Sequence, residues 1–218
     1  MEDYRQGLYR HAVVLRVGSM ISSFTLRRLV LTGVLLMFGA HLLALLLSGQ
    51  SAMSTPISQL SRASGSGGIH TGGLILLALV QLAVAVLLSR TGCRSRLWTA
   101  AVWLTVFNGA CLLFIAMYFL RAPASLLFGP DANDPLAVLA SSVGVIMGLL
   151  QKDLRQIAPR CARYNAVFFV LWLALIPVIP FIDGAWLGAY ERTVGAILLA
   201  WLAMLALLCP DGSSATRA

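Results

Sequence analysis

Charged residues are scarce in this sequence. Only 11% of the 218 residues are Asp, Glu, Lys or Arg, whereas 59% are hydrophobic. Soluble domains carry roughly a quarter charged residues, and a soluble core of this size has no room for so much apolar surface. The composition therefore excludes an ordinary soluble globular domain and favours a chain whose solvent is largely lipid.

Residues that commonly bind metals or act as nucleophiles are also few. The four cysteines show neither paired spacing nor zinc-type spacing, so ordinary reduced thiols are expected. The three histidines, His11, His41 and His70, are scattered, and the sequence has no G-x-S-x-G, P-loop or H-E-x-x-H motif. These absences argue against an enzyme, so no catalytic residue, cofactor or metal is predicted. A zinc-dependent lipid hydrolase would need His41, His70 and several acids to converge at one depth.

The sequence is rich in long apolar runs. Residues 29–47 follow Arg27 and Arg28 and, at about 1.5 Å per residue, are long enough to cross roughly 30 Å of hydrocarbon. Five further runs cover residues 72–88, 97–120, 135–150, 166–181 and 193–208. The predicted fold is an all-α membrane protein, a bundle of six transmembrane helices over residues 29–208. A basic segment, 1–28, would precede it on the membrane face, and a short tail, 209–218, would follow.

Basic residues predict the orientation of these six spans. Three of the 16 Lys and Arg residues, Arg62, Arg121 and Arg192, fall on one side, and the other 13 fall on the side that holds both termini. Lys and Arg accumulate on the cytoplasmic side of a membrane, so both termini are predicted to be cytoplasmic. Topology and anionic headgroups therefore explain the net charge of +8, and no nucleic-acid partner is predicted.

The predicted outer loop after the first span, residues 48–71, contains a helix-start signal. Thr55 is a good helix cap, and Pro56 suits the first helical position, so a short helix is expected here. A stretch rich in Gly and Ser then leads into His70. The short helix could form a lid over an outward-facing pocket, or it could be an amphipathic interfacial helix that only seals the bundle.

Three polar side chains lie near the predicted midplane of the membrane. His41, Gln81 and Asn108 belong to the first three spans and lie at similar depths. Polar groups in hydrocarbon need partners, because leaving them unsatisfied is costly. The three residues could line a shared ligand pocket, or they could form a structural hydrogen-bond cluster between helices.

Small residues and prolines give expectations about helix packing. Ala140, Gly144 and Gly148 form a small-xxx-small row that allows a close approach, either by another helix of this chain or by a second copy. Pro177 and Pro180 each remove a backbone donor, so the fifth span should break or kink near its outer end.

Acidic residues gather in the predicted outer loops. They are either solvated loop charges or part of a site for a cation or a cationic headgroup. The outer charged residues are Asp131, Asp134, Asp183 and Glu191, accompanied by Arg121 and Arg192. The candidate residues of an outward-facing binding site are Ser58, Gln59, His70, Asp131, Asp183, Glu191 and Arg192.

Two short motifs resemble a known family. Ile57-Ser58-Gln59-Leu60 after the first span, and residues 188–195 at the last span, are similar to a bacterial six-span membrane family called domain of unknown function 998. The similarity runs roughly from Leu29 to Leu208. It implies a six-span fold and a location in the bacterial inner membrane, and it implies no activity. Many members have an acidic residue at the position of Gln59, so a carboxylate role for that loop is in doubt here.

Two function classes remain open. The favoured one is a non-catalytic protein that binds membrane lipids or another membrane protein through an outward-facing site, which predicts a blind, mostly apolar cavity with a polar mouth. A small transporter is the alternative, and it predicts a continuous polar path past His41, Gln81 and Asn108. His41 is the only ionisable residue predicted deep in a span, and no internal repeat is evident, so transport is disfavoured.

Overall fold

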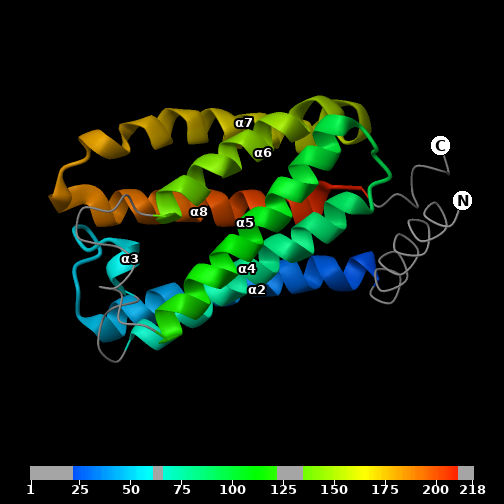
Figure 1. Cartoon of the computed structure of the whole chain (residues 1–218). Helices are drawn as coiled ribbons and strands as arrows, with labels where there is room; N and C mark the ends of the chain where they lie inside the picture. The colour runs from blue at the N-terminus through cyan, green and yellow to red at the C-terminus, as the bar shows by residue number, and fades with distance from the viewer. Residues whose placement is uncertain (1–21, 61–65, 122–134, 211–218) are drawn as a thin grey trace, which may run out of the picture.

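A computed structural model describes residues 22–60, 66–121 and 135–210 (Figure 1). Within these ranges the chain is helical and has no strand, as predicted. The long helices are α2 (Ser23–Ser48), α4 (Gly67–Ser89), α5 (Arg96–Arg121), α6 (Pro135–Ile157), α7 (Pro159–Leu175) and α8 (Gly184–Leu208). A short helix, α3 (Ile57–Leu60), lies between α2 and α4, and a 3-10 helix, η1 (Ile176–Phe181), joins α7 to α8.

Five of these helices are long and apolar enough to cross a membrane. They are α2, α4, α5, α7 with part of η1, and α8. Helix α6 has 23 residues and is not among the five found in the described part of the chain. The chain is therefore a multi-pass helical membrane protein, whereas the sixth span stays a prediction.

Several helices extend beyond the apolar runs that predicted them. Helix α4 begins at Gly67, so His70 lies inside a helix and not in the preceding loop as predicted. Helix α8 begins at Gly184, so Glu191 and Arg192 are helical residues and do not precede the last span. Hydropathy locates the stretch that lipid surrounds, whereas a helix starts where a cap satisfies its first amide groups. For α8 that cap is Asp183, whose carboxylate accepts a hydrogen bond from the Ala185 N–H at 3.2 Å.

The six long helices pack as a closed ring (Figure 1). Each contacts the next one along the chain, and α8 returns to contact α2 and α4. Small residues permit close approaches between neighbours: a Cβ atom on Gly144 would lie 2.9 Å from Trp172 of α7, and one on Gly148 would lie 3.4 Å from Phe169. The close approach that the glycine row predicts thus occurs between α6 and α7 of the same chain. The side chain of Ala140 lies outside the described part of the structure.

The outside of the ring is covered by large apolar side chains. Leu35 of α2 is 71% exposed, and Phe114 of α5 and Val170 of α7 are similarly uncovered. A surface of this kind would be unfavourable in water but suits the hydrocarbon of a bilayer. The interior contains three fully buried tryptophans, Trp98, Trp172 and Trp201.

The two ends of the ring differ in their connections. We call the end that carries residues 49–60 and η1 the loop end, and the end that carries the α4–α5 and α6–α7 connections the basic end (left and right in Figure 1). At the basic end, Arg27 of α2 donates to the carbonyl oxygens of Leu207, at 3.4 Å, and Cys209. A cation at the carboxyl end of α8 also interacts favourably with the helix dipole. Arg27 therefore stabilises the contact between α2 and α8.

The predicted break in the fifth span is confirmed. Helix α7 ends at Leu175, and both Pro177 and Pro180 lie in the 3-10 helix η1. The Tyr190 hydroxyl of α8 donates to the Leu175 carbonyl oxygen at 2.6 Å. This bond supplies a donor at a helix end, where carbonyl groups lack intrahelical partners.

Candidate functional site

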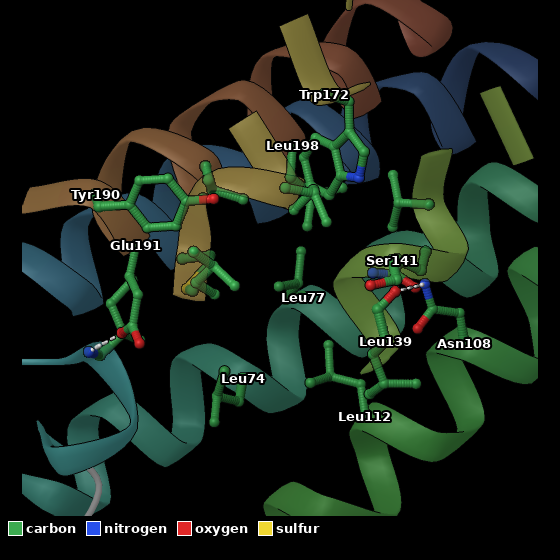
Figure 2. Close-up of a pocket in the computed structure, with 18 residues that line it drawn as sticks. Leu74, Leu77, Asn108, Leu112, Leu139, Ser141, Trp172, Tyr190, Glu191 and Leu198 are labelled. Carbon is green, nitrogen blue, oxygen red and sulfur yellow. Dashed lines mark hydrogen bonds between the residues drawn. The ribbon is translucent and has the colours of Figure 1, made fainter. Parts of the chain in front are cut away.

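A cavity of about 220 Å³ lies inside the ring, between residues of all six long helices, α3 and η1 (Figure 2). Most of its wall is apolar and includes Leu74, Leu77, Leu112 and Leu198. Tyr190 and Glu191 lie on one side of the hollow, and Asn108 lies on the opposite side. A mostly apolar cavity with a few polar groups is the usual form of a site for a small or lipid-like ligand.

The polar part of the cavity wall includes two side-chain amides. Gln81 of α4 is 4% exposed, and Asn108 of α5 is 2% exposed. The Asn108 Nδ2 donates to the Leu139 carbonyl oxygen at 3.4 Å, but neither the Asn108 Oδ1 nor the Gln81 Oε1 has a hydrogen-bond partner within residues 22–60, 66–121 and 135–210. An unsatisfied buried polar atom costs about 1–3 kcal/mol. Each oxygen is therefore an acceptor that an O–H or N–H group of a ligand would satisfy.

The three polar residues predicted near the membrane midplane lie in two different places. Gln81 and Asn108 both line the cavity, whereas His41 does not. His41 instead lies against His70, with 5.6 Å between the ring centroids and an edge-to-face angle of 65°. The structure thus brings together two histidines that the sequence assigned to different sites.

The segment before α3 is bound to the amino-terminal part of α8. The Ala189 N–H donates to the Met53 carbonyl oxygen at 2.9 Å. Arg192 Nη1 donates to the carbonyl oxygens of Ala52 and Thr55, each at 2.8 Å. Because an arginine of α8 binds two loop carbonyls and a backbone bond lies beside them, this connection is held to the bundle.

The two motifs that carry the family resemblance are in direct contact. The backbone N–H of Ile57, the first residue of α3, donates to the Glu191 carboxylate (Figure 2). Gly188 lies so close to the loop that a Cβ atom there would be 2.4 Å from the Thr55 carbonyl oxygen. Glycine at this position is what lets the loop approach α8. The predicted short helix exists as α3, but it begins at Ile57, one residue after the predicted start at Pro56.

His41, His70 and Arg192 form a second polar group, which we call the histidine–arginine cluster. His70 is fully buried and His41 is 8% exposed, and none of their four ring nitrogens has a hydrogen-bond partner in the described part of the chain. Arg192 is close enough to interact electrostatically with both rings. Its Nε and Nη2 atoms are also buried without a partner, as is the Ser66 hydroxyl oxygen.

The remaining predicted binding residues lie elsewhere. Asp183 is exposed and caps α8, and Gln59 is exposed on α3. Asp131 and the side chain of Ser58 lie outside the described residues. Asp134 also lies outside the described residues, and of the two described outer acids, Asp183 and Glu191, Glu191 lines the cavity. In the described ranges, no group of three His, Cys, Asp or Glu residues is placed to hold a metal ion.

Sequence reasoning missed a buried network at Asn165 of α7. The Asn165 Nδ2 donates to the Met147 carbonyl oxygen at 2.9 Å and to the Gln151 Oε1 at 2.7 Å. Its Oδ1 accepts a hydrogen bond from the Trp201 Nε1 at 2.9 Å. The network joins α6, α7 and α8, and the satisfied Asn165 amide indicates a structural role. The one signal in the sequence was that Gln151 and Asn165 flank apolar runs, but sequence does not show that they face each other.

The fold and the cavity define the class: a multi-pass helical integral membrane protein with a mostly apolar cavity between its helices. Residues 30–208 match the family described as protein of unknown function DUF998, so the chain belongs to this family. The resemblance inferred from the two short motifs is thereby confirmed. No curated protein and no solved structure matches the chain.

Proposed function

We propose that the protein crosses a bacterial inner membrane six times, with the basic end in the cytoplasm. The place of α6 in the ring supports a sixth span, because α6 packs against both α5 and α7. The asymmetry of Lys and Arg supports the orientation. Arginines at the basic end include Arg27, Arg28, Arg90, Arg94, Arg155, Arg160 and Arg163.

We infer that the cavity binds a membrane lipid without catalysing a reaction. The observation that carries this inference is the mostly apolar hollow of about 220 Å³ whose wall contains the unpartnered oxygens of Gln81 and Asn108. An apolar cavity of ~150 Å³ is already large enough to hold benzene, so this one has room for part of an acyl chain. The two amide oxygens would accept hydrogen bonds from hydroxyl or amide groups of the same molecule.

The position of His41 favours binding over transport. A transporter would need a row of polar side chains along the bundle. The sequence analysis predicted that His41, Gln81 and Asn108 would form this row. Because His41 lies against His70 and is not part of the cavity wall, the three side chains do not line one cavity together.

Filling the cavity tests the proposal. Leu112→Trp would place a larger side chain in the cavity wall, so we expect the purified variant to lose the lipid that the wild-type protein retains in native mass spectrometry after detergent washing. Leu35→Trp is the matched control, because Leu35 is 71% exposed on the outside of α2. Equal lipid retention by wild type, Leu112→Trp and Leu35→Trp would contradict the proposal.

A further inference from the structure

The histidine–arginine cluster contains several buried hydrogen-bonding atoms that the fold does not use. Among the residues that the structure describes, all four ring nitrogens of His41 and His70 lack hydrogen-bond partners, as do Nε and Nη2 of Arg192. Only Nη1 of Arg192 is engaged, by the carbonyl oxygens of the loop. Buried polar side chains in folded proteins are normally satisfied, so a group of neighbouring exceptions needs a physical explanation.

The chemistry of the cluster favours an anion. In either neutral tautomer each imidazole has one N–H donor, and an arginine side chain has donors only. The cluster therefore presents N–H groups from three helices, α2, α4 and α8, together with the positive charge of Arg192. Glu191 also interacts electrostatically with Arg192, but its carboxylate accepts a hydrogen bond from the Ile57 N–H at α3.

A metal cation fits the same place poorly. Two histidines alone supply too few ligands for a typical zinc site, which has three or four protein ligands. The described residues offer no third His, Cys, Asp or Glu in a suitable group. The guanidinium of Arg192 would also repel a cation beside the two rings.

The cluster lies next to the cavity. His41 follows the cavity-lining Met37 by four residues in α2, and His70 precedes the cavity-lining Leu74 by four residues in α4. Residues four apart lie on the same helix face, about one turn or 6 Å from each other. Because α2 runs toward the loop end and α4 runs away from it, both histidines lie one turn beyond the cavity wall toward the loop end.

We propose that His41, His70 and Arg192 bind the phosphate group of an amphipathic molecule whose apolar part occupies the cavity. This inference rests on the proposed lipid-binding function and deepens it, because it specifies the headgroup chemistry. Arginine and imidazole N–H groups form charge-assisted hydrogen bonds with phosphate oxygens. The buried hydroxyl of Ser66, which also lacks a partner, is a further donor at the amino-terminal end of α4.

The decisive variant is His41→Phe combined with His70→Phe. Phenylalanine rings can keep the edge-to-face contact of the two imidazoles while removing all four nitrogens. Purified full-length protein in detergent would be titrated with three probes: dihexanoyl phosphatidylglycerol, dihexanoyl glycerol without phosphate, and inorganic phosphate. We expect the double variant to bind the phospholipid at least about tenfold more weakly than wild type, since hydrogen bonds to a charged group are each worth about that factor. Binding of dihexanoyl glycerol should be unchanged.

The variant Leu112→Trp distinguishes the proposed phosphate site from the proposed binding of lipid in the cavity. It should weaken binding of both dihexanoyl molecules, while any binding of inorganic phosphate should persist. If Leu112→Trp has no effect but the double Phe variant still weakens phospholipid binding, the cavity proposal fails and the phosphate site stands. Binding of inorganic phosphate by wild type would indicate that a free anion suffices, and binding of the phospholipid alone would indicate a lipid headgroup.

Two results would overturn the phosphate site. One is that the double Phe variant binds the phospholipid as tightly as wild type. The other result needs wild-type protein alone, so it can be obtained even if the double variant does not fold. It is that neither phosphate nor dihexanoyl phosphatidylglycerol raises the thermal unfolding temperature of wild type more than dihexanoyl glycerol and equimolar chloride do.

Discussion

Gly188→Ala is the most direct test of how the loop is held to α8. A Cβ atom at this position would lie 2.4 Å from the Thr55 carbonyl oxygen, 2.7 Å from Arg192 Nη1 and 2.9 Å from the Met53 carbonyl oxygen. Two of these three neighbours are backbone atoms, which cannot rotate away as a side chain would. The loop would therefore have to move by about 1 Å to restore ordinary van der Waals contact near 3.5 Å.

The displacement has two costs. Overpacking against neighbouring atoms costs about 1–3 kcal/mol, and weakening the hydrogen bonds of a charged donor such as Arg192 costs up to about 1.5–3 kcal/mol for each bond lost. Replacing glycine by alanine inside a helix would by itself stabilise the protein by up to about 1 kcal/mol. We expect a net loss of about 3 kcal/mol in the free energy of unfolding, as a sum of these terms.

Gly39→Ala is the matched control. Gly39 lies inside α2, and a Cβ atom there would have no neighbour within 4 Å, so the same substitution should leave stability unchanged or raise it slightly. The assays are thermal unfolding in detergent and hydrogen exchange at the Ile57 and Ala189 amides, which should exchange faster in Gly188→Ala. If Gly188→Ala matches Gly39→Ala in stability and both amides stay protected, the described contact between the loop and α8 is wrong.

Two further predictions concern buried polar groups. Asn165→Leu leaves Trp201 Nε1 and Gln151 Oε1 without their Asn165 partner and should lower the free energy of unfolding by about 2–4 kcal/mol. Gln81→Met, which removes an unpartnered oxygen at similar volume, should change it by less than about 1.5 kcal/mol in lipid-free protein. Equal losses in these two variants, measured by denaturant titration, would refute the distinction between satisfied and unsatisfied amides. Tyr190→Phe removes the bond to the Leu175 carbonyl oxygen and should cost about 1 kcal/mol, with faster exchange of the η1 amides; an unchanged exchange rate would contradict it.

The sequence by itself determined that lipid surrounds the apolar runs and roughly how long each membrane-spanning segment is. Apolar runs such as 29–47 must be surrounded by lipid. A run of this kind forms a helix there, because each backbone group then makes its hydrogen bond within the same segment. The break in the fifth span was also readable, since Pro177 and Pro180 lack backbone donors. These properties are local, so they depend on neighbouring residues along the chain and not on the partners of a helix.

Tertiary structure alone decided which polar residues meet. Depth along a span can be counted from the sequence at about 1.5 Å per residue, and this placed His41, Gln81 and Asn108 at similar levels. The rotation of each helix about its axis is set by its neighbours in the ring, and the packing of α2 against α4 brings His41 to His70, one turn beyond the cavity wall. Arg192 likewise meets the loop and both histidines because α8 begins at Gly184, well before its apolar run. Packing contacts, which no single segment contains, therefore divided the polar residues between the cavity and the cluster.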